Sequence, residues 1–331
     1  MAYDGKIMRR ALQRFEEDRR RRQEAFRRRE EAVYQKEPRL REIDRELSGT
    51  MSRIITTALR QGTDPRPAVE VLKNRNLGLQ RQRAELLGAL GYPADYLMEK
   101  PACALCGDTG YQGEAVCRCL RSYYAKEQQK ELSRMLDLGS QSFETFSLEW
   151  YSPRLSPQTG LSARENMERN KDICVDYAYD FNEKSGNLLL TGEPGLGKTF
   201  LSACIARVVS ERGYSVVYDT AVHIFERFET RKFSREEDDE AEDDVSRILN
   251  CDLLILDDLG TEMTTAFVQS ALYQIVNTRL MQRRSTIIST NLGIQEIGQR
   301  YLQQVTSRIE GEYQILIFFG EDIRRQKKER Q

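Results

Sequence analysis

A glycine-rich octapeptide in the second half of the chain has the residue types and spacing that bind nucleotide phosphates. It fills every fixed position of the pattern G-x-x-x-x-G-K-[ST] with Gly192, Glu193, Pro194, Gly195, Leu196, Gly197, Lys198 and Thr199. Glycines let the backbone curl so that its N–H groups point at phosphate oxygens, and the lysine reaches the outer phosphates. The threonine hydroxyl is a ligand for magnesium. The sequence therefore predicts a nucleoside triphosphate site; a chance Gly-Lys-Thr in a turn is the alternative.

The segments on either side of this loop supply the context that the motif requires. An apolar run precedes it at residues 188–190, and a helix-periodic stretch follows it at residues 200–209. The positive end of a helix that begins near Lys198 adds to the attraction for phosphate. We therefore expect the loop to join a buried strand to a helix.

Two adjacent acids and one amide end apolar runs further along the chain. Asp257 and Asp258 follow the aliphatic residues 253–256, and Asn291 follows residues 286–290. The carboxyl ends of strands in open α/β sheets are where ligands bind. We expect Asp257 to hold magnesium, directly or through water, and Asp258 to polarise the attacking water. Asn291 is placed to hydrogen-bond the γ-phosphate or that water; a solvated strand end is the alternative for the acids.

Four of the seven cysteines lie close together, at Cys103, Cys106, Cys117 and Cys119. Glycines between them allow tight turns, and four thiolates suit tetrahedral zinc in a closed, structural site. A redox pair and incidental cysteines are the alternatives. The other three cysteines, Cys174, Cys204 and Cys251, stand alone and are predicted to be small buried residues. The single histidine, His223, has no second histidine to pair with, so histidine-based hydrolysis is excluded.

The charge of the chain is unevenly distributed along its 331 residues. The net charge is −1, but residues 1–100 hold 23 Lys and Arg against 16 Asp and Glu, an excess of +7. No apolar run approaches the roughly 20 residues of a membrane span, and arginines and glutamates stand where a secretory core would be. We expect a cytoplasmic protein that does not bind membranes.

Helix-like and strand-like segments predict three parts. Residues 1–98 read as an α-helical, arginine-rich region, with one long helix over residues 3–47 and shorter helices at 51–60 and 67–90. Residues 99–140 hold the cysteines and a helix at 120–138. Residues 141–331 form the third part and contain a linker at 152–160. After the linker, helices alternate with strands near 188–190, 215–218, 253–257, 285–290 and 314–319. This alternation predicts an α/β P-loop fold with a parallel sheet covered on both faces.

Two charged segments have more than one interpretation. The long first helix is either a solvated face or a docking helix for a partner, since arginines interrupt its apolar seam. The acidic run at residues 236–244 is predicted to be a mobile loop, and a phosphate mimic is the alternative. Arg231 and Lys232, beside Phe233, are the candidate DNA contacts.

Four motifs together resemble a known family. They are the phosphate loop, Leu-Leu-Ile-Leu-Asp-Asp-Leu-Gly-Thr-Glu at residues 253–262, Ile-Ile-Ser-Thr-Asn at 287–291 and Gly-Glu-Asp-Ile-Arg at 320–324. Residues 141–326 resemble the AAA+ ATPases of the DnaC/DnaI helicase-loader group, which includes the IstB transposition helpers. The segment with the four clustered cysteines resembles the corresponding segment of loader-like proteins from Gram-positive bacteria and their mobile elements.

The resemblance implies ATP as the nucleotide and assigns roles by position. Lys198 and Thr199 resemble the Walker A pair, Asp257 and Asp258 the Walker B acids, and Asn291 sensor 1. Arg308 resembles the arginine finger that reaches a neighbouring subunit's nucleotide, and Arg324 the sensor 2 arginine. A surface salt bridge is the alternative for Arg308, and Arg300 is the rival finger. Only seven residues follow Arg324, so the helical lid of other AAA+ proteins is missing, as in loaders of this group.

The resemblance also implies a function and its partners. We expect an ATP-dependent loader of a DnaB-type replicative helicase, with the N-terminal region on the helicase and the ATPase domain on single-stranded DNA and on further copies of itself. An IstB-like helper of a transposase on duplex DNA is the alternative within the fold. A zinc-stapled adaptor with a nucleotide switch and a small-molecule kinase are the alternatives from other classes.

Overall fold

The computed structural model describes residues 3–60, 66–135, 141–155, 160–233 and 239–330. The chain forms two compact units, which we call the sheet unit (residues 1–13 and 118–331) and the helical unit (residues 14–117). The unit boundary at residue 117 falls inside the cysteine segment. The domain boundaries expected after residues 98 and 140 therefore stay predictions.

The sheet unit contains a five-stranded parallel sheet with the order β4-β5-β6-β3-β7. The strands are β3 (Asn187–Gly192), β4 (Val216–Thr220), β5 (Leu253–Leu259), β6 (Ser285–Thr290) and β7 (Tyr313–Phe318). Every strand lies near a segment where the sequence predicted one. The phosphate loop follows the strand β3, which has neighbours on both sides.

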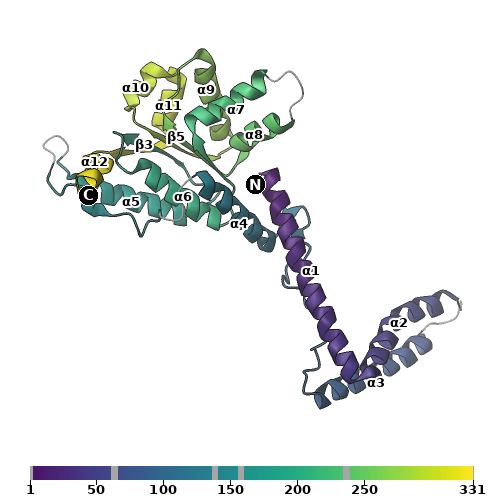
Figure 1. Ribbon diagram of the computed structural model, residues 1–331. Coiled ribbons are helices and arrows are strands. Elements are labelled where there is room, and N and C mark those ends of the chain that lie inside the picture. Colours follow the sequence, from purple (N-terminus) through teal and green to yellow (C-terminus); the bar gives the residue numbers. More distant parts are fainter. Residues whose placement is uncertain (1–2, 61–65, 136–140, 156–159, 234–238, 331) are drawn as a thin grey trace. The chain divides into compact units, whose positions relative to one another are not determined.

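Helices cover both faces of this sheet (Figure 1). Leu188 and Leu190 pack with α5 (Ala163–Tyr179) and α6 (Lys198–Glu211) in one core, whereas Leu189 packs in a second core. The second core also takes residues from α7 (Ala221–Phe233), α8 (Asp239–Asn250), α9 (Ala266–Met281) and α11 (Gln303–Glu312). Successive strand residues face opposite sides, so nearly continuous apolar strands produce two cores. The predicted α/β fold is confirmed.

The helix α4 (Arg118–Met135) covers the edge strand β4. The Gln128 side chain donates to the Tyr214 carbonyl at 2.8 Å and accepts from the Val216 N–H at 3.0 Å. These bonds occupy backbone groups beside the start of a strand edge that would otherwise be open to pairing with another chain. Asp4 joins the same region, because its N–H donates to the Tyr124 hydroxyl on α4 at 3.0 Å and its carboxylate lies 2.6 Å from the Arg247 guanidinium on α8.

The described residues of the helical unit form three helices and a small hairpin. The helices are α1 (Gly5–Lys36), α2 (Pro38–Arg60) and α3 (Arg66–Ala89), and the hairpin pairs β1 (Tyr111–Gln112) with β2 (Ala115–Val116). The first residues of α1 belong to the sheet unit. Val33, Leu40, Leu87 and Leu97 form the core of the helical unit.

Two sequence expectations about local structure are wrong. The helix expected over residues 3–47 ends at Lys36 and a new one begins at Pro38, because proline cannot donate within a helix but fits its first position. The acidic run is also not simply a loop: residues from Asp239 onward are helical, because Val245 and Ile248 on the same helix are buried. Residues 236–238 of that run, and 156–159 of the expected linker, lie outside the described residues.

In the part of the chain that the structure describes, no helix is both long enough and apolar enough to cross a membrane.

Candidate nucleotide and metal sites

The phosphate loop lies between β3 and α6, and two of its glycines are required by close approaches. A Cβ atom at Gly192 (φ 144°) would lie 2.0 Å from the Phe318 carbonyl oxygen. At Gly195 (φ 77°) it would lie 2.0 Å from a carboxylate oxygen of Asp322. Because glycine has no Cβ atom, β7 and the segment after it can lie directly against the loop.

A cavity of about 410 Å³ opens over this loop and brings together most of the predicted site residues. Its lining includes Pro194 to Thr199 of the loop, Asp258, Asn291 and Arg324. Aromatic and aliphatic side chains complete it, with Phe146, Trp150, Tyr151, Phe200 and Ile323. A cavity that combines phosphate-binding groups with flat apolar side chains suits a nucleotide.

Lys198 lies buried at the start of α6, and its ammonium group is held by the loop. It donates to the carbonyl oxygens of Gly192 at 2.5 Å and of Glu193 at 2.8 Å. Burial lowers the pKa of Lys198, and the nearby carboxylates of Asp258 and Asp257 oppose that shift. The Lys198 ammonium group therefore lies where it can bind the phosphate oxygens of a nucleotide.

The two acids at the end of β5 point in different directions. The β5–β6 register shifts between Leu256 and Leu259, and Asp258 has a φ of 53°. Asp257 is consequently buried below the loop, whereas Asp258 is exposed and lines the cavity. Burial first, and then the Asp257 charge, raise the pKa of Asp258. Of the two acids, the irregular strand end thus exposes only the second to the cavity.

Asp257 is oriented by hydroxyl groups from three neighbouring segments. One carboxylate oxygen accepts from the Tyr218 hydroxyl at 2.6 Å. The other accepts from the Ser289 hydroxyl and lies 3.4 Å from the Thr199 hydroxyl oxygen. Thr199 and Asp257 therefore lie where both could hold one magnesium ion. Tyr218 and Ser289 were missed; the only sequence signal was their place near the ends of predicted strands.

The Gly-Glu-Asp-Ile-Arg motif places Arg324 at the cavity. Asp322 caps α12 (Ile323–Glu329) by accepting from the Arg324 N–H at 2.8 Å. The Ile323 N–H donates to the Gly195 carbonyl at 3.1 Å, which ties α12 to the phosphate loop. Trp150 lies beside the same helix, with the Arg330 guanidinium 4.5 Å from its ring centre. This wall was not predicted, although the aromatic stretch at 143–151 was visible in the sequence.

Neither candidate finger arginine lines its own chain's cavity. On α11, Arg308 donates to the Asn277 side chain and to the Gln304 carbonyl, both at 3.1 Å, and lies over the Tyr273 ring. Arg308 forms no ion pair with any described residue, which disfavours a surface salt bridge. Arg300 donates to the Thr264 hydroxyl at 2.7 Å and to the Glu262 carbonyl at 2.6 Å, so it braces the segment after β5.

The side chains chosen as possible DNA contacts are engaged within the chain. Arg231 binds both carboxylate oxygens of Glu242 at 2.6 and 2.7 Å. Lys232 lies 5.0 Å from the ring centre of Phe267, while Phe233 is 64% exposed. His223, bonded to Asp219, is a surface residue outside the cavity.

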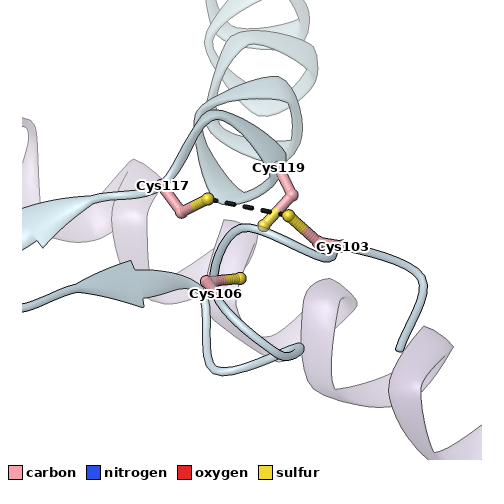
Figure 2. A group of neighbouring side chains, drawn as sticks. All are labelled: Cys103, Cys106, Cys117 and Cys119. Carbon is pink, nitrogen blue, oxygen red and sulfur yellow. Dashed lines mark hydrogen bonds between the residues drawn. The ribbon is translucent and has the colours of Figure 1, made fainter. Parts of the chain in front are cut away.

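The four clustered cysteines fit a zinc ion (Figure 2). Their sulfur atoms lie within 4.8 Å of one another, and the Cys103 and Cys117 sulfurs are 3.7 Å apart. Tetrahedral Zn–S bonds of about 2.3 Å place two sulfurs about 3.8 Å apart, whereas a disulfide needs about 2.05 Å. None of the described cysteines forms a disulfide. The three isolated cysteines are buried, as predicted, and burial raises the pKa of Cys174 to about 12.

Zinc binding by this cluster leads to a direct prediction. We expect the purified chain to contain about one zinc ion per molecule and Cys117→Ser to lose most of it, because the remaining three thiolates leave the tetrahedral site incomplete. Metal analysis by mass spectrometry measures both. Cys204→Ala, which removes a buried cysteine outside the cluster, is the control and should keep its zinc. Equal zinc content in all three proteins would contradict the prediction.

Comparison with known proteins finds relatives of the second half of the chain. A family model described as IstB-like ATP binding protein matches residues 167–329. The replicative helicase loader DnaC of Buchnera aphidicola subsp. Baizongia pistaciae (strain Bp) is 25% identical over 163 residues, 48% of this chain and 66% of that protein. DnaC of Escherichia coli (strain K12) is 26% identical over 147 residues, 44% of this chain and 59% of that protein.

The match covers only part of each protein. The chain spans 59% to 66% of the length of these two relatives. A solved structure described as the crystal structure of the DnaC helicase loader is 21% identical, with 54% of this chain and 98% of that chain covered and a TM-score of 0.42.

Proposed function

Because residues 167–329 match a family model described as IstB-like ATP binding protein and the chain resembles proteins named replicative helicase loader DnaC, we propose that this protein is an ATP-dependent loader of a replicative DNA helicase. The observation that carries the proposal is the cavity in which Lys198, Asp258, Asn291 and Arg324 meet. The two curated relatives described above are named replicative helicase loaders, and the cavity holds groups that ATP hydrolysis would use. An adaptor with a silent nucleotide site would not need the second acid.

The predicted site residues each have a role in hydrolysis under this proposal. Lys198 and the loop N–H groups bind the phosphates, and Asp258 accepts a proton from, or orients, the attacking water. Asn291 hydrogen-bonds the γ-phosphate or that water. A magnesium ion held near Thr199 and Asp257 would neutralise charge on the phosphates. Arg324, at the capped start of α12, contacts the bound nucleotide from the part of the cavity wall that α12 forms.

Completion of the site by a second copy couples hydrolysis to assembly. Transition-state charge on the γ-phosphate is stabilised in related NTPases by an arginine from outside the binding pocket. Arg308 lies outside the cavity of its own chain, held by Asn277 and Tyr273 and without a carboxylate partner among the described residues. We assign it as the finger for a neighbouring copy, so that an isolated chain hydrolyses ATP slowly.

The partners divide between the two parts of the chain. The N-terminal region, including the zinc segment, binds the helicase. The ATPase domain assembles side by side and contacts single-stranded DNA. ATP hydrolysis, which begins when copies assemble, then times the release of the helicase.

Complex formation with the helicase tests this function. Full-length protein, ATP and the DnaB-type helicase of the same host are expected to co-elute in size-exclusion chromatography. A transposase from the same host is expected to elute separately. Failure to bind the helicase, or preferential binding of the transposase, would contradict the proposal.

The second candidate is a helper ATPase for a transposase. The matching family model is described as IstB-like, which favours this function. Such a helper should prefer duplex DNA over single strands of the same length and sequence. Binding of two labelled oligonucleotides, one single-stranded and one duplex, distinguishes the two functions.

Tyr218 provides a prediction about the magnesium site. Tyr218→Phe leaves one buried oxygen of Asp257 without its hydroxyl donor, and loss of such supporting bonds costs about 10–100-fold in metal affinity. We expect the magnesium concentration for half-maximal binding of a fluorescent ATP analogue to rise about tenfold or more. Tyr177→Phe is the control, since its hydroxyl bonds the Gly186 carbonyl outside the cavity. An unchanged magnesium dependence would show that Tyr218 does not position Asp257.

A further inference from the structure

The helical unit has a groove along one face of α1. Two adjoining hollows of about 600 and 340 Å³ share Arg29 and Lys100 in their lining. One wall is a stripe of α1 formed by Arg19, Arg22, Phe26 and Arg29. Their spacing of three, four and three residues places them on one helix face over about 15 Å. The other wall comes from residues between 93 and 109.

The cations that line the groove use only part of their hydrogen-bonding capacity within the chain. Lys100 pairs with Asp95 at 2.5 Å, and Arg19 donates to the Asp108 carbonyl at a long 3.4 Å. The Nε atoms of Arg19 and Arg29 are buried and have no hydrogen-bond partner among the described residues. Arg22 lies 3.4 Å from a carboxylate oxygen of Asp108, a long contact for an ion pair. A guanidinium binds a carboxylate through two parallel bonds, so these side chains favour an anionic ligand.

Apolar surface accompanies the charge. Phe26 and Pro101 line the larger hollow, and Met98, which is 56% exposed, lines the smaller one. A ligand that fills both hollows must therefore combine acidic with apolar groups. A peptide segment has both at neighbouring positions.

Two observations favour a peptide over a nucleic acid. Arg29 lies 5.0 and 5.2 Å from the ring centres of Phe26 and Tyr96, and Tyr92 stacks on Tyr96 at 4.3 Å. These contacts cover ring faces on which nucleic-acid bases would stack. Glu99 and Asp108 also line the groove and would repel a continuous phosphate backbone, whereas an acidic peptide can place apolar residues opposite them.

We propose that this groove is the docking site for an acidic, partly apolar peptide segment of a protein partner. Identification of that partner as the helicase rests on the function proposed above, whereas the assignment of the groove as a peptide site does not. Asp108 connects the groove to the cysteine segment, because its carboxylate accepts from the N–H groups of Ala102 and Cys103 at 3.0 and 2.8 Å. The zinc segment thus holds one wall of the groove in place.

Selection from a random 12-residue peptide display library on the full chain tests the proposal. Enriched peptides are expected to carry net negative charge and apolar residues. Their affinities, measured by fluorescence anisotropy, should fall at least tenfold for Arg22→Glu and for Lys100→Glu. Arg21→Glu is the matched control: this residue lies on the same helix, is 76% exposed and is not among the groove residues. Its affinities should stay within twofold of the unmodified chain, and ATP binding should be unchanged in all three variants.

Other outcomes overturn the proposal. Absence of enriched peptides, enrichment of peptides without negative charge, or equal losses in all three variants would show that the groove is not a peptide site. A labelled 20-nucleotide oligothymidine whose binding depends on Arg22 and Lys100 would identify a nucleic-acid groove. Failure of the chain to bind the helicase, with the peptide results intact, would overturn the proposed function and leave the groove assigned.

Discussion

Asp258→Asn is expected to lower kcat for ATP hydrolysis by about 10²–10⁴-fold, the usual contribution of a positioned acid or base. Asp258 is the acid that the irregular end of β5 turns toward the cavity, whereas Asp257 stays buried under the loop. The amide keeps the size of the side chain but cannot accept a proton from water. Steady-state turnover at saturating ATP and magnesium measures the effect.

ATP affinity separates loss of chemistry from loss of the site. We expect the dissociation constant for ATP to stay within about threefold in Asp258→Asn, because the phosphates are bound by the loop and Lys198. Asp176→Asn, the same change on an exposed residue of α5, should leave both quantities unchanged. Turnover of Asp258→Asn within twofold of the unmodified chain would remove Asp258 from the reaction.

Arg308→Ala is expected to lower kcat by about 10³–10⁵-fold in the assembled protein, the range for arginine fingers in NTPases. The guanidinium lies outside its own cavity and is held by Asn277 and the Tyr273 ring, which is a suitable arrangement for presenting it to another copy. ATP binding by the isolated chain should not change. Arg207→Ala, which removes a partly exposed arginine of α6 whose guanidinium pairs with Glu211, is the matched control.

Mixing two inactive variants tests whether the finger acts between copies. Arg308→Ala retains an intact cavity, and Asp258→Asn retains an intact finger. At a contact between them, one arrangement combines the intact parts, so the mixture should regain part of the activity that each protein lacks alone. A mixture as inactive as its components would contradict a finger that acts on a neighbour.

The residues that short sequence patterns define were the most predictable. The phosphate loop, the apolar runs before it and before Asp257, and the strand that ends at Asn291 are each set by a few consecutive residues. Their strands are adjacent in the sheet, which brings Lys198, Asp258 and Asn291 to one cavity. Four cysteines within seventeen residues likewise give a local cluster.

Features that depend on contacts between distant segments were not predictable. Tyr218 and Ser289 reach Asp257 only because β4 and β6 flank β5, an order that the chain sequence does not state. The aromatic wall of the cavity depends on the packing of α12 against Trp150. The acidic run was assigned to a loop from charge alone, whereas burial of Val245 and Ile248 decides its helical structure from Asp239 onward.

Loading of the helicase onto a closed circle of single-stranded DNA tests the central claim most directly. A closed circle has no end onto which a ring can thread, so a loader is required. We expect the number of helicase rings recovered on the circle to rise at least tenfold when this protein and ATP are both present. Lys198→Ala should abolish the increase. Recovery of the same number of rings without the protein, or with Lys198→Ala in its place, would contradict the assignment as an ATP-dependent loader.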